Sequence, residues 1–409
     1  MWVLDKVLRK LIRRGELEVA VPGGKVHRFG TPDPELEPVT LRFHDRKVAG
    51  EIVRNARLAA AEAYMDGRLT FDRGDMLALL RLIGANRSWE EHASGYTFKG
   101  ERMARWRARL RPGNRERQSR SNASHHYDIG NALYRLFLDE DMQYSCAYFR
   151  DPADSLEQAQ EDKKAHIAAK LHLKPGQRVL DIGCGWGGLA LYLHRHYGVE
   201  VLGVTLADEQ LALARERAEA AGVPDKVRFE LLDYRKVEGQ FDRIVSIGMF
   251  EHVGAAHYEA LFAKCRSLLK PDGVMLLHTI GRFDRPDFGD PFAAKYIFPG
   301  YYLPSLSQMI RGGESAPLIA TDVETLRLHY AFTLEHWLER TRAKREEIVA
   351  LYDERFLRMW EVYLAGALTM FESGGGCVYQ VQYARSRQAL PLTRDYMVEE
   401  EARLRGSAA

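Results

Sequence analysis

Alternating hydrophobic and polar positions predict that the chain begins with a mixture of helix and short strands. In residues 1–15 apolar side chains recur at the i, i+3, i+4 and i+7 spacing of an amphipathic helix, which we expect to stop at its final glycine. Apolar residues then alternate with polar ones over 17–21 and 39–43, and a helical pattern follows near 50–65. The N-terminal region therefore reads as a small α+β domain.

From about residue 160 the pattern changes to apolar runs separated by helical segments. Helices are clearest at Asp208–Ala221 and Tyr258–Leu269, two more helical segments follow residue 335, and a closing strand is predicted at 378–384. This order is typical of an α/β fold with a doubly wound, mainly parallel, Rossmann-like sheet, whose ligands bind at the carboxyl ends of the strands. The five predicted strands are 178–182, 201–204, 227–232, 241–247 and 273–280.

The overall charge does not call for a nucleic-acid partner, but its distribution is uneven. The chain has 59 basic and 57 acidic residues, whereas residues 99–120 hold nine Lys or Arg against two Glu. This segment is either solvated surface or a contact with an anionic bilayer; nucleic-acid binding is a third alternative, weakened by the lack of a recognition motif. The basic first helix, with Trp2, can likewise lie on a membrane or pack on a core.

The four cysteines predict neither a metal site nor a disulfide framework. Cys146, Cys184, Cys265 and Cys377 lie far apart and have no partner at zinc-ligand spacing. A reduced, cytoplasmic setting fits this pattern best. Because no signal peptide and no stretch of about 18 apolar residues is visible, we expect a soluble or membrane-peripheral protein.

A glycine-rich turn after the strand at 178–182 carries the first candidate chemistry. Gly183, Gly185 and Gly187 would let the backbone approach a ligand closely, although the same spacing serves a tight turn or a dinucleotide site. Asp181 before the first glycine and Asp233 after the third strand favour another interpretation. Together these features resemble class I S-adenosylmethionine-dependent methyltransferases.

Further motifs narrow the resemblance to cyclopropane-fatty-acyl-phospholipid synthases and mycolic acid cyclopropane synthases. The similarity runs from about residue 120 to 337. With the patterns described above, we expect a lipid- or membrane-associated domain at 1–95, a basic linker at 96–120 and a methyltransferase domain at 121–409. The motifs are His125–Asn131, Met142–Phe149, Gly248–Gly254, Leu277–Gly281, Tyr296–Gly300 and Leu303–Ser305.

The resemblance implies how the cofactor is held. The amino acid part of the cofactor would contact Tyr144, Ser145 and the loop containing Asp181, Gly183, Gly185 and Gly187. The ribose would contact Thr205 and Gln210. The adenine would contact Asp233 and Tyr234. Many methyltransferases carry an acidic residue where this chain has Thr205. Its hydroxyl can still make one hydrogen bond there, and Asp208 is an alternative acceptor.

The resemblance also implies a bicarbonate ion beside the reacting alkene. Methyl addition leaves a carbocation, so a base must remove a proton from the new methyl group before the ring closes, while apolar walls keep water away. The residues implied to bind bicarbonate are Cys146, Glu251, His278, Ile280 through its backbone, and Tyr330. The thiol, carboxylate and imidazole among them also have purely structural explanations, as a buried thiol, a carboxylate at a helix N-terminus and a core imidazole.

The resemblance implies an enzyme that adds a methyl(ene) group from S-adenosylmethionine to double bonds of unsaturated phospholipid, and we expect it to act at an anionic membrane and to form a cyclopropane. Tyr301-Tyr302 and Gly374–Cys377 depart from the family pattern, so a methyl-branched chain without ring closure stays an alternative product. A non-catalytic lipid- or nucleic-acid-binding protein is the alternative outside the enzymes. We expect attachment to the inner face of the membrane without bound nucleic acid, and leave a homodimer open.

Overall fold

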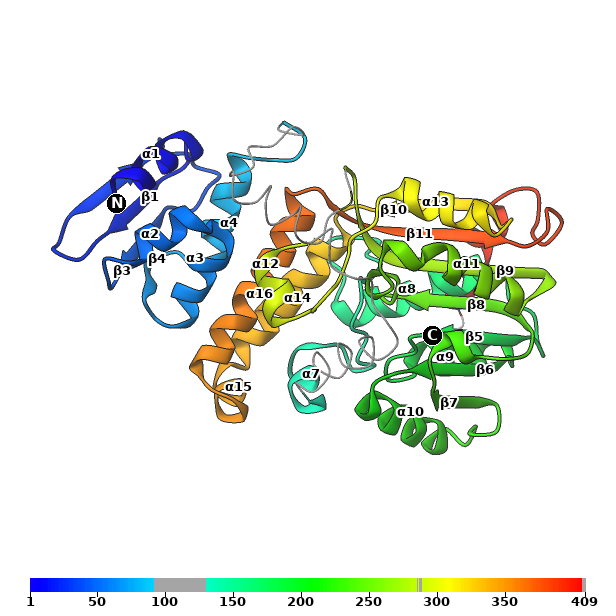
Figure 1. Ribbon diagram of the computed structural model, residues 1–409. Coiled ribbons are helices and arrows are strands. Elements are labelled where there is room, and N and C mark those ends of the chain that lie inside the picture. The colour runs from blue at the N-terminus through cyan, green and yellow to red at the C-terminus, as the bar shows by residue number, and fades with distance from the viewer. Residues whose placement is uncertain (92–129, 285, 287–288, 407–409) are drawn as a thin grey trace. The chain divides into compact units, whose positions relative to one another are not determined.

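The computed structural model describes residues 1–91, 130–284, 286 and 289–406, which form two compact units (Figure 1). The basic segment at 99–120 and most of the motif His125–Asn131 lie outside these residues, and the predicted domain limits stay a prediction. As far as they are described, unit 1 contains Met1–Arg111, Phe288–Pro299 and Leu334–Gly376, and unit 2 contains Pro112–Asp287, Gly300–Thr333 and Cys377–Ala409.

Unit 1 combines a small sheet with helices. The strand order is β2-β1-β3-β4; β1 runs parallel to β3 and antiparallel to β2, and β3 is antiparallel to β4. Its strands are β1 (Leu17–Ala20), β2 (Val26–Phe29), β3 (Val39–Phe43) and β4 (Leu69–Arg73). Its helices are α1 (Trp2–Leu11), α2 (Val48–Arg54), α3 (Ala56–Met65), α4 (Met76–Ala85), α12 (Pro291–Tyr296), most of α14 (His329–Ala343), α15 (Arg345–Leu351) and α16 (Glu354–Glu372).

Two helix boundaries in unit 1 differ from the prediction. α1 ends at Leu11, not Gly15, because Ile12 is extended and the next two backbone nitrogens donate to the Asn86 side chain at 2.8 and 2.9 Å. The helix predicted at 50–65 is two helices, since the backbone at Asn55 leaves the helical region with φ −151° and ψ 80°. Side-chain periodicity does not reveal such local backbone breaks.

Unit 2 is built on a seven-stranded sheet, which confirms the predicted α/β, mainly parallel fold. The strand order is β10-β11-β9-β8-β5-β6-β7; neighbours from β9 to β7 run parallel, and β10 is antiparallel to β11. The strands are β5 (Arg178–Ile182), β6 (Glu200–Thr205), β7 (Val227–Leu231), β8 (Phe241–Ile247), β9 (Leu269–Arg282), β10 (Ile319–Leu326) and β11 (Gly376–Ala384).

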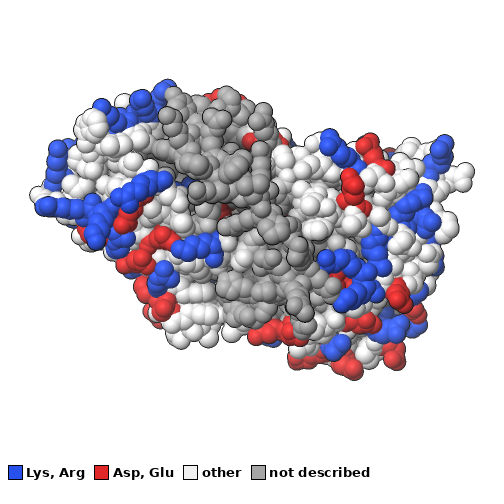
Figure 2. Space-filling view, viewed as in Figure 1, with Lys and Arg blue, Asp and Glu red and all other residues white. Residues whose placement is uncertain are grey.

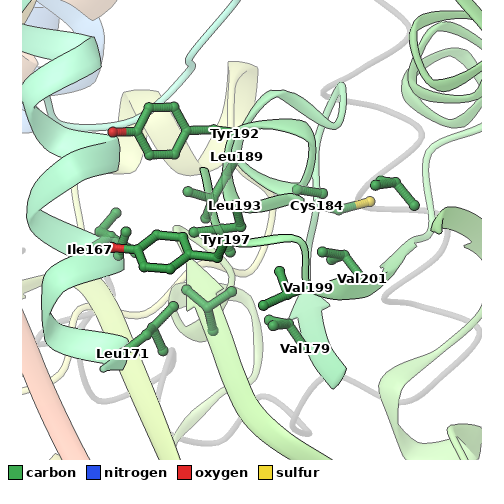
Figure 3. Packing of buried hydrophobic residues seen from close by; sticks show 14 of the residues in the cluster. Ile167, Leu171, Val179, Cys184, Leu189, Tyr192, Leu193, Tyr197, Val199 and Val201 are labelled. Atoms are coloured by element: carbon green, nitrogen blue, oxygen red, sulfur yellow. The ribbon is translucent and has the colours of Figure 1, made fainter. Parts of the chain in front are cut away.

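Helices of unit 2 pack on this sheet through a continuous hydrophobic cluster (Figure 3). In it Ile167 of α8 and Leu193 of α9 are fully buried together with Val179 of β5. Burying a side chain of this size stabilises the fold by about 1.5–3 kcal/mol. The helices that contribute are α8 (Leu156–Leu171), α9 (Gly188–Tyr197), α10 (Asp208–Ala220) and α17 (Asp395–Gly406).

The remaining elements of unit 2 are short or closely packed. In α13 (Leu306–Ser315), a Cβ at Gly312 would come within 2.5 Å of the Phe262 ring of α11 (Tyr258–Leu268), so glycine lets these helices approach. The unit also contains α7 (Asn131–Phe137) and the 3-10 turns η1 (Tyr234–Lys236), η2 (Phe250–His252) and η3 (Ala255–His257). In neither unit is any described helix both long and apolar enough to span a bilayer.

Candidate active site

The carboxyl ends of the parallel strands bring most predicted site residues to one edge of the sheet. In the register of β8 and β9, Ile247 pairs with His278, and the Gly248 nitrogen donates to the His278 carbonyl at 3.0 Å. Ligands of open α/β sheets bind at this edge. The loop after β5 carries Gly183, β6 ends at Thr205, Asp233 follows β7, Glu251 lies in η2 after β8, and His278 is in β9.

The glycine loop has the backbone shape that a close-approaching ligand requires. Gly183 and Gly185 have φ +85° and +54°, and a Cβ at Gly185 would project into open space. At Gly183 the added Cβ would lie 3.1 Å from Met249. Gly187 has a packing role as well, because its Cβ would come within 2.5 Å of the Phe229 ring. The backbone around Gly185 is therefore open to a closely approaching ligand.

The two acidic residues that the sequence singled out, Asp181 before the loop and Asp233 after β7, lie in different environments. Asp181 in β5 is buried, and burial raises the pKa of its carboxyl to about 7. Asp233 is also buried; burial favours its neutral form, but hydrogen bonds from Arg235 outweigh this and lower its pKa. Asp233 caps η1 by accepting from the Arg235 nitrogen at 3.0 Å, and the Arg235 guanidinium lies 5.7 Å from the Tyr234 ring. Adenine binding by Asp233 and Tyr234 stays a prediction.

Thr205 and Gln210 form one buried polar pair. The Thr205 hydroxyl donates to Oε1 of Gln210 at 3.2 Å and accepts from the Ala207 nitrogen at 3.2 Å. Both side chains are buried. The turn at the end of β6 thus joins the two residues that we predicted to bind the ribose of the cofactor. This contact does not test either role.

The segment around Tyr144 and Ser145 is held by polar residues of α8 that the sequence analysis missed. Nζ of Lys163, with no exposed surface, lies 2.6 Å from Oε1 of Gln143 and 2.9 Å from Oγ of Ser145. The Gln160 amide donates to the carbonyls of Gln143 and Ser145 at 3.2 and 3.1 Å. Burial lowers the pKa of Lys163 to about 8. One helix therefore fixes both the backbone and the hydroxyl of this segment.

Tyr144 extends from the same segment into an aromatic cluster. Its ring lies 5.0 Å from that of Tyr134 and 6.2 Å from that of Phe137, measured between centroids. Trp186 of the glycine loop is 5.0 Å from Tyr134 and donates from its indole nitrogen to Asn131 at 2.7 Å. This cluster brings the predicted Tyr144 contact next to the glycine loop.

Cys146 is buried, and its thiol donates to the Ala147 carbonyl at 3.3 Å. Burial raises the pKa of this thiol far above its usual range, so it stays protonated and is a poor nucleophile. The Ala147 nitrogen donates to Oγ1 of Thr333 at 3.0 Å. Thr333 lies in α14, one turn after Tyr330. This bond joins the Cys146 segment to the helix turn that carries the buried Tyr330.

Glu251 is a buried carboxyl bound to the end of β9. Its Oε1 accepts from the Ile280 nitrogen at 2.5 Å, whereas its Oε2 has no hydrogen-bond partner among the described residues. Burial raises the pKa of Glu251 to about 7. The backbone nitrogen of Tyr302 donates to the Glu251 carbonyl at 2.9 Å. Glu251 can therefore carry or release a proton near neutral pH.

His278 is a buried, neutral imidazole. Burial lowers its pKa to about 3, with a smaller contribution in the same direction from nearby cations. Nδ1 lies 3.1 Å from Nε2 of Gln380 in β11, another residue that sequence reasoning missed. The geometry joins Glu251 to Ile280 directly, and the full bicarbonate set stays a prediction.

Comparisons with known proteins identify the family. The profile described as mycolic acid cyclopropane synthetase matches residues 114–381. The chain is 41% identical over 350 residues to the cyclopropane-fatty-acyl-phospholipid synthase of Escherichia coli K12, covering 85% of this chain and 88% of that protein. It is 39% identical over 397 residues to a tuberculostearic acid methyltransferase of Mycobacterium tuberculosis, covering 92% and 90%.

Solved structures show the same similarity. A cyclopropane synthase from Mycobacterium tuberculosis superposes with a TM-score of 0.62 at 34% identity, over 65% of this chain and 98% of that one. A mycolic acid cyclopropane synthase in complex with SAH gives the same TM-score, identity and coverage. The chain therefore belongs to the mycolic acid cyclopropane synthetase family and is an S-adenosylmethionine-dependent methyltransferase.

Proposed function

We propose that this enzyme transfers a one-carbon unit from S-adenosylmethionine to a double bond in an unsaturated phospholipid acyl chain and closes a cyclopropane ring. The observation that carries the proposal is the cluster at the carboxyl ends of β5, β8 and β9. There the glycine loop follows β5, the buried carboxyl of Glu251 lies after β8, and the neutral imidazole of His278 lies in β9. The relative from Escherichia coli supports this choice of substrate through its name.

The residues present fit S-adenosylmethionine. Open space beside Gly185 leaves room for the ligand's amino acid end, and Lys163 holds the hydroxyl of Ser145. The buried pair Thr205 and Gln210 offers hydroxyl and amide groups for the ribose. When bound, the cofactor supplies an electrophilic methyl group. The chain's task is to hold that group close to the alkene and in line with it.

We also propose that the site takes a bicarbonate ion as the base for ring closure. A second negative charge beside an ionised Glu251 would be unfavourable unless a proton is shared between the two groups. The raised pKa of Glu251 fits this requirement, since the protonated carboxyl can donate a hydrogen bond to an anion. His278 would supply a second donor without carrying charge.

Aromatic side chains would protect the reacting carbon from water. The rings of Phe250 and Tyr258 stack with centroids 4.0 Å apart, and Tyr302 meets Tyr258 at 6.3 Å. Tyr302 is buried and its hydroxyl accepts from Gln308 at 2.9 Å. Because the backbone nitrogen of Tyr302 donates to the Glu251 carbonyl, this ring lies next to the turn that carries Glu251 and would help to exclude water from the proposed anion site.

A second product stays in consideration because one similar protein is named differently. The relative from Mycobacterium tuberculosis is a tuberculostearic acid methyltransferase, at 39% identity. The alternative activity would add the methyl group to the same alkene and lose the proton from a neighbouring chain carbon, which leaves a methyl-branched unsaturated chain. The position of the base relative to the new methyl group decides between the two outcomes.

We further propose that α1 helps the enzyme to reach an anionic membrane. Trp2 and Val3 are 70% and 46% exposed, and Nζ of Lys6 lies 3.9 Å from the Trp2 ring centroid. In Figure 2 Lys and Arg side chains are dense over the N-terminal elements. A basic helix with exposed apolar residues can lie in the interface of an anionic bilayer.

Vesicle cosedimentation tests the membrane proposal. Binding should require anionic lipid and weaken as added salt shortens the Debye length from about 8 Å. Trp2→Ala together with Lys6→Ala should reduce binding, while Val26→Ala, which removes another exposed apolar side chain of the same unit, should not. Equal binding to neutral vesicles at high salt would contradict the proposal.

Binding and turnover together test the proposed enzyme activity. Calorimetry should detect S-adenosylmethionine binding, and incubation with unsaturated phospholipid vesicles should add one CH₂ to the lipid for each alkene that reacts. Cofactor binding without any gain in lipid mass would overturn the proposed activity and favour a non-catalytic lipid-binding role.

A further inference from the structure

Gln380 makes a side-chain contact with one of the proposed anion-binding residues. It lies in β11, next to β9 in the sheet, and both Gln380 and His278 are buried, with 0% and 2% exposure. The Gln380 amide nitrogen Nε2 is 3.1 Å from Nδ1 of His278. Water therefore does not compete for this hydrogen bond.

The polarity of this bond defines where the imidazole carries its proton. A neutral imidazole has one N–H donor and one acceptor nitrogen, and an amide nitrogen can only donate. Nδ1 of His278 must then accept from Gln380, which leaves the proton on Nε2. Rotating the amide by half a turn would give the opposite tautomer, with Oε1 accepting from Nδ1–H.

The surroundings of Gln380 disfavour that rotated amide. Its Oε1 is buried without a hydrogen-bond partner among the described residues. The rotated form would place the NH₂ group there and leave two buried N–H donors without a partner in the described part of the chain, whereas the present form leaves one N–H and one acceptor, and orphaned buried N–H groups are the rarer case in proteins.

Charged groups around the imidazole favour its neutral state. Lys163, His166 and Lys170 of α8 disfavour a positive charge on His278, and Glu324 of β10 opposes them weakly. Burial acts in the same direction as the cations and is the largest effect. The ring therefore remains a one-donor, one-acceptor group, so the identity of the protonated nitrogen matters.

We propose that Gln380 is a positioning residue that holds His278 as the Nε2–H tautomer, with Nε2 available to donate to the anion of the active site. This inference rests on the proposed function, because it assigns the imidazole a donor role toward bicarbonate. An Nε2 that lacked its proton would present a lone pair to the anion and repel it. Gln380 acts only through His278 and touches no reacting atom.

The test compares Gln380→Met with Gln382→Met. Methionine keeps the length of glutamine but removes the donor. Gln382 is a matched control because it lies two residues further along β11, is 1% exposed, and donates to the Tyr396 hydroxyl at 2.8 Å and to the Lys170 carbonyl. Both variants lose buried amide bonds, but only one touches His278.

Steady-state kinetics gives the first readout. Gln380→Met should raise the bicarbonate concentration for half-maximal activity by roughly tenfold, as expected for the loss of a well-placed donor. Its rate at saturating bicarbonate and its affinity for S-adenosylmethionine should stay close to those of the unmodified enzyme. Gln382→Met should leave the bicarbonate dependence unchanged. Equal effects of the two substitutions would overturn the proposal.

A nitrogen NMR spectrum gives a readout that is independent of turnover and of the folding of any Gln380 variant. In ¹⁵N-histidine-labelled protein without ligand, the His278 signals are identified by their loss in His278→Gln. We expect a protonated Nε2 and an unprotonated, hydrogen-bonded Nδ1. A protonated Nδ1 would refute the role of Gln380 even in an active enzyme. If the spectrum is as expected but activity needs no bicarbonate, the proposed anion site would be refuted and the tautomer assignment would stand.

Discussion

The backbone nitrogen of Ile280 donates a hydrogen bond to Oε1 of Glu251 at 2.5 Å, which joins the end of β9 to the turn after β8. The other carboxyl oxygen has no partner among the described residues, and burial raises the pKa of Glu251 to about 7. One oxygen is thus held by the backbone while the other is left to exchange a proton. This arrangement suits a group that shares a proton with a bound anion.

Glu251→Gln should slow turnover about 100-fold or more, in the range for loss of a group that takes part in acid–base chemistry. The glutamine carbonyl can still accept from Ile280, so the fold and the affinity for S-adenosylmethionine should change little. Product formation measured over a bicarbonate series, together with calorimetry, checks both statements. Full activity of the variant in bicarbonate-depleted buffer would remove Glu251 from the mechanism.

The stability of the ligand-free enzyme should also report the buried Glu251 carboxyl. Below pH 4.5 it is protonated in both the folded and the unfolded states. Between pH 4.5 and about 7 the unfolded chain releases this proton first, so this group's contribution to stability falls as pH rises and is lost above its folded pKa. The total effect is about 3 kcal/mol.

Glu251→Gln removes that titration and leaves the other groups in place. The Tm of the variant, relative to that of the unmodified protein, should therefore rise when thermal unfolding is repeated at pH 8 instead of pH 4.5. A Tm difference that does not change with pH would show that Glu251 ionises in the folded protein as easily as in the unfolded chain.

Gly185→Ala should abolish or strongly weaken the binding of S-adenosylmethionine. The new Cβ would project into the open space beside the loop that we assign to the cofactor. Gly198→Ala is the matched control, because Gly198 also has a positive φ, +63°, and open space around its Cβ, but lies at the far end of α9. Similar affinities of the two variants in calorimetry would place the cofactor elsewhere.

Lys163→Met should weaken S-adenosylmethionine binding roughly tenfold or more, since Ser145 and Gln143 would lose the charge-assisted donor that orients them. Lys170→Met provides the comparison: Lys170 is a buried lysine of the same helix, but it pairs with Asp322 and Glu324 of β10. Both substitutions should lower the Tm. Equal losses of cofactor affinity would mean that Lys163 acts only through general stability.

Sequence patterns predicted the strands in which apolar residues predominate. β5 and β8 have the predicted limits, because a strand buried on both faces is mostly apolar even where single polar residues such as Asp181 and Ser246 occur. β10 was not predicted: Asp322 and Glu324 interrupt its pattern, and both are compensated by Lys170 of α8, a partner far away in sequence. Local periodicity contains no signal for such a pairing.

The same distinction applies to the candidate site. Glycine spacing after β5 indicated Gly185, and the resemblance to cyclopropane synthases implied Glu251 and His278, which the carboxyl ends of the parallel strands bring to the same edge of the sheet. Lys163 and Gln380 were missed, since a lysine in a charged helix or a glutamine in a strand is usually at the surface. A signal for Lys163 existed in the i, i+3, i+7 spacing of Lys163, His166 and Lys170, which places them on one helix face.

The product of the reaction tests the central claim most directly. Unsaturated phospholipid vesicles, S-adenosylmethionine and bicarbonate are incubated with the enzyme, and the purified lipid is examined by proton NMR, because both candidate products gain the same CH₂. We predict that olefinic signals decrease and high-field cyclopropane methylene signals take their place. Retained olefinic signals with a new branched methyl group would contradict ring closure, and an unchanged lipid spectrum would contradict the proposed activity.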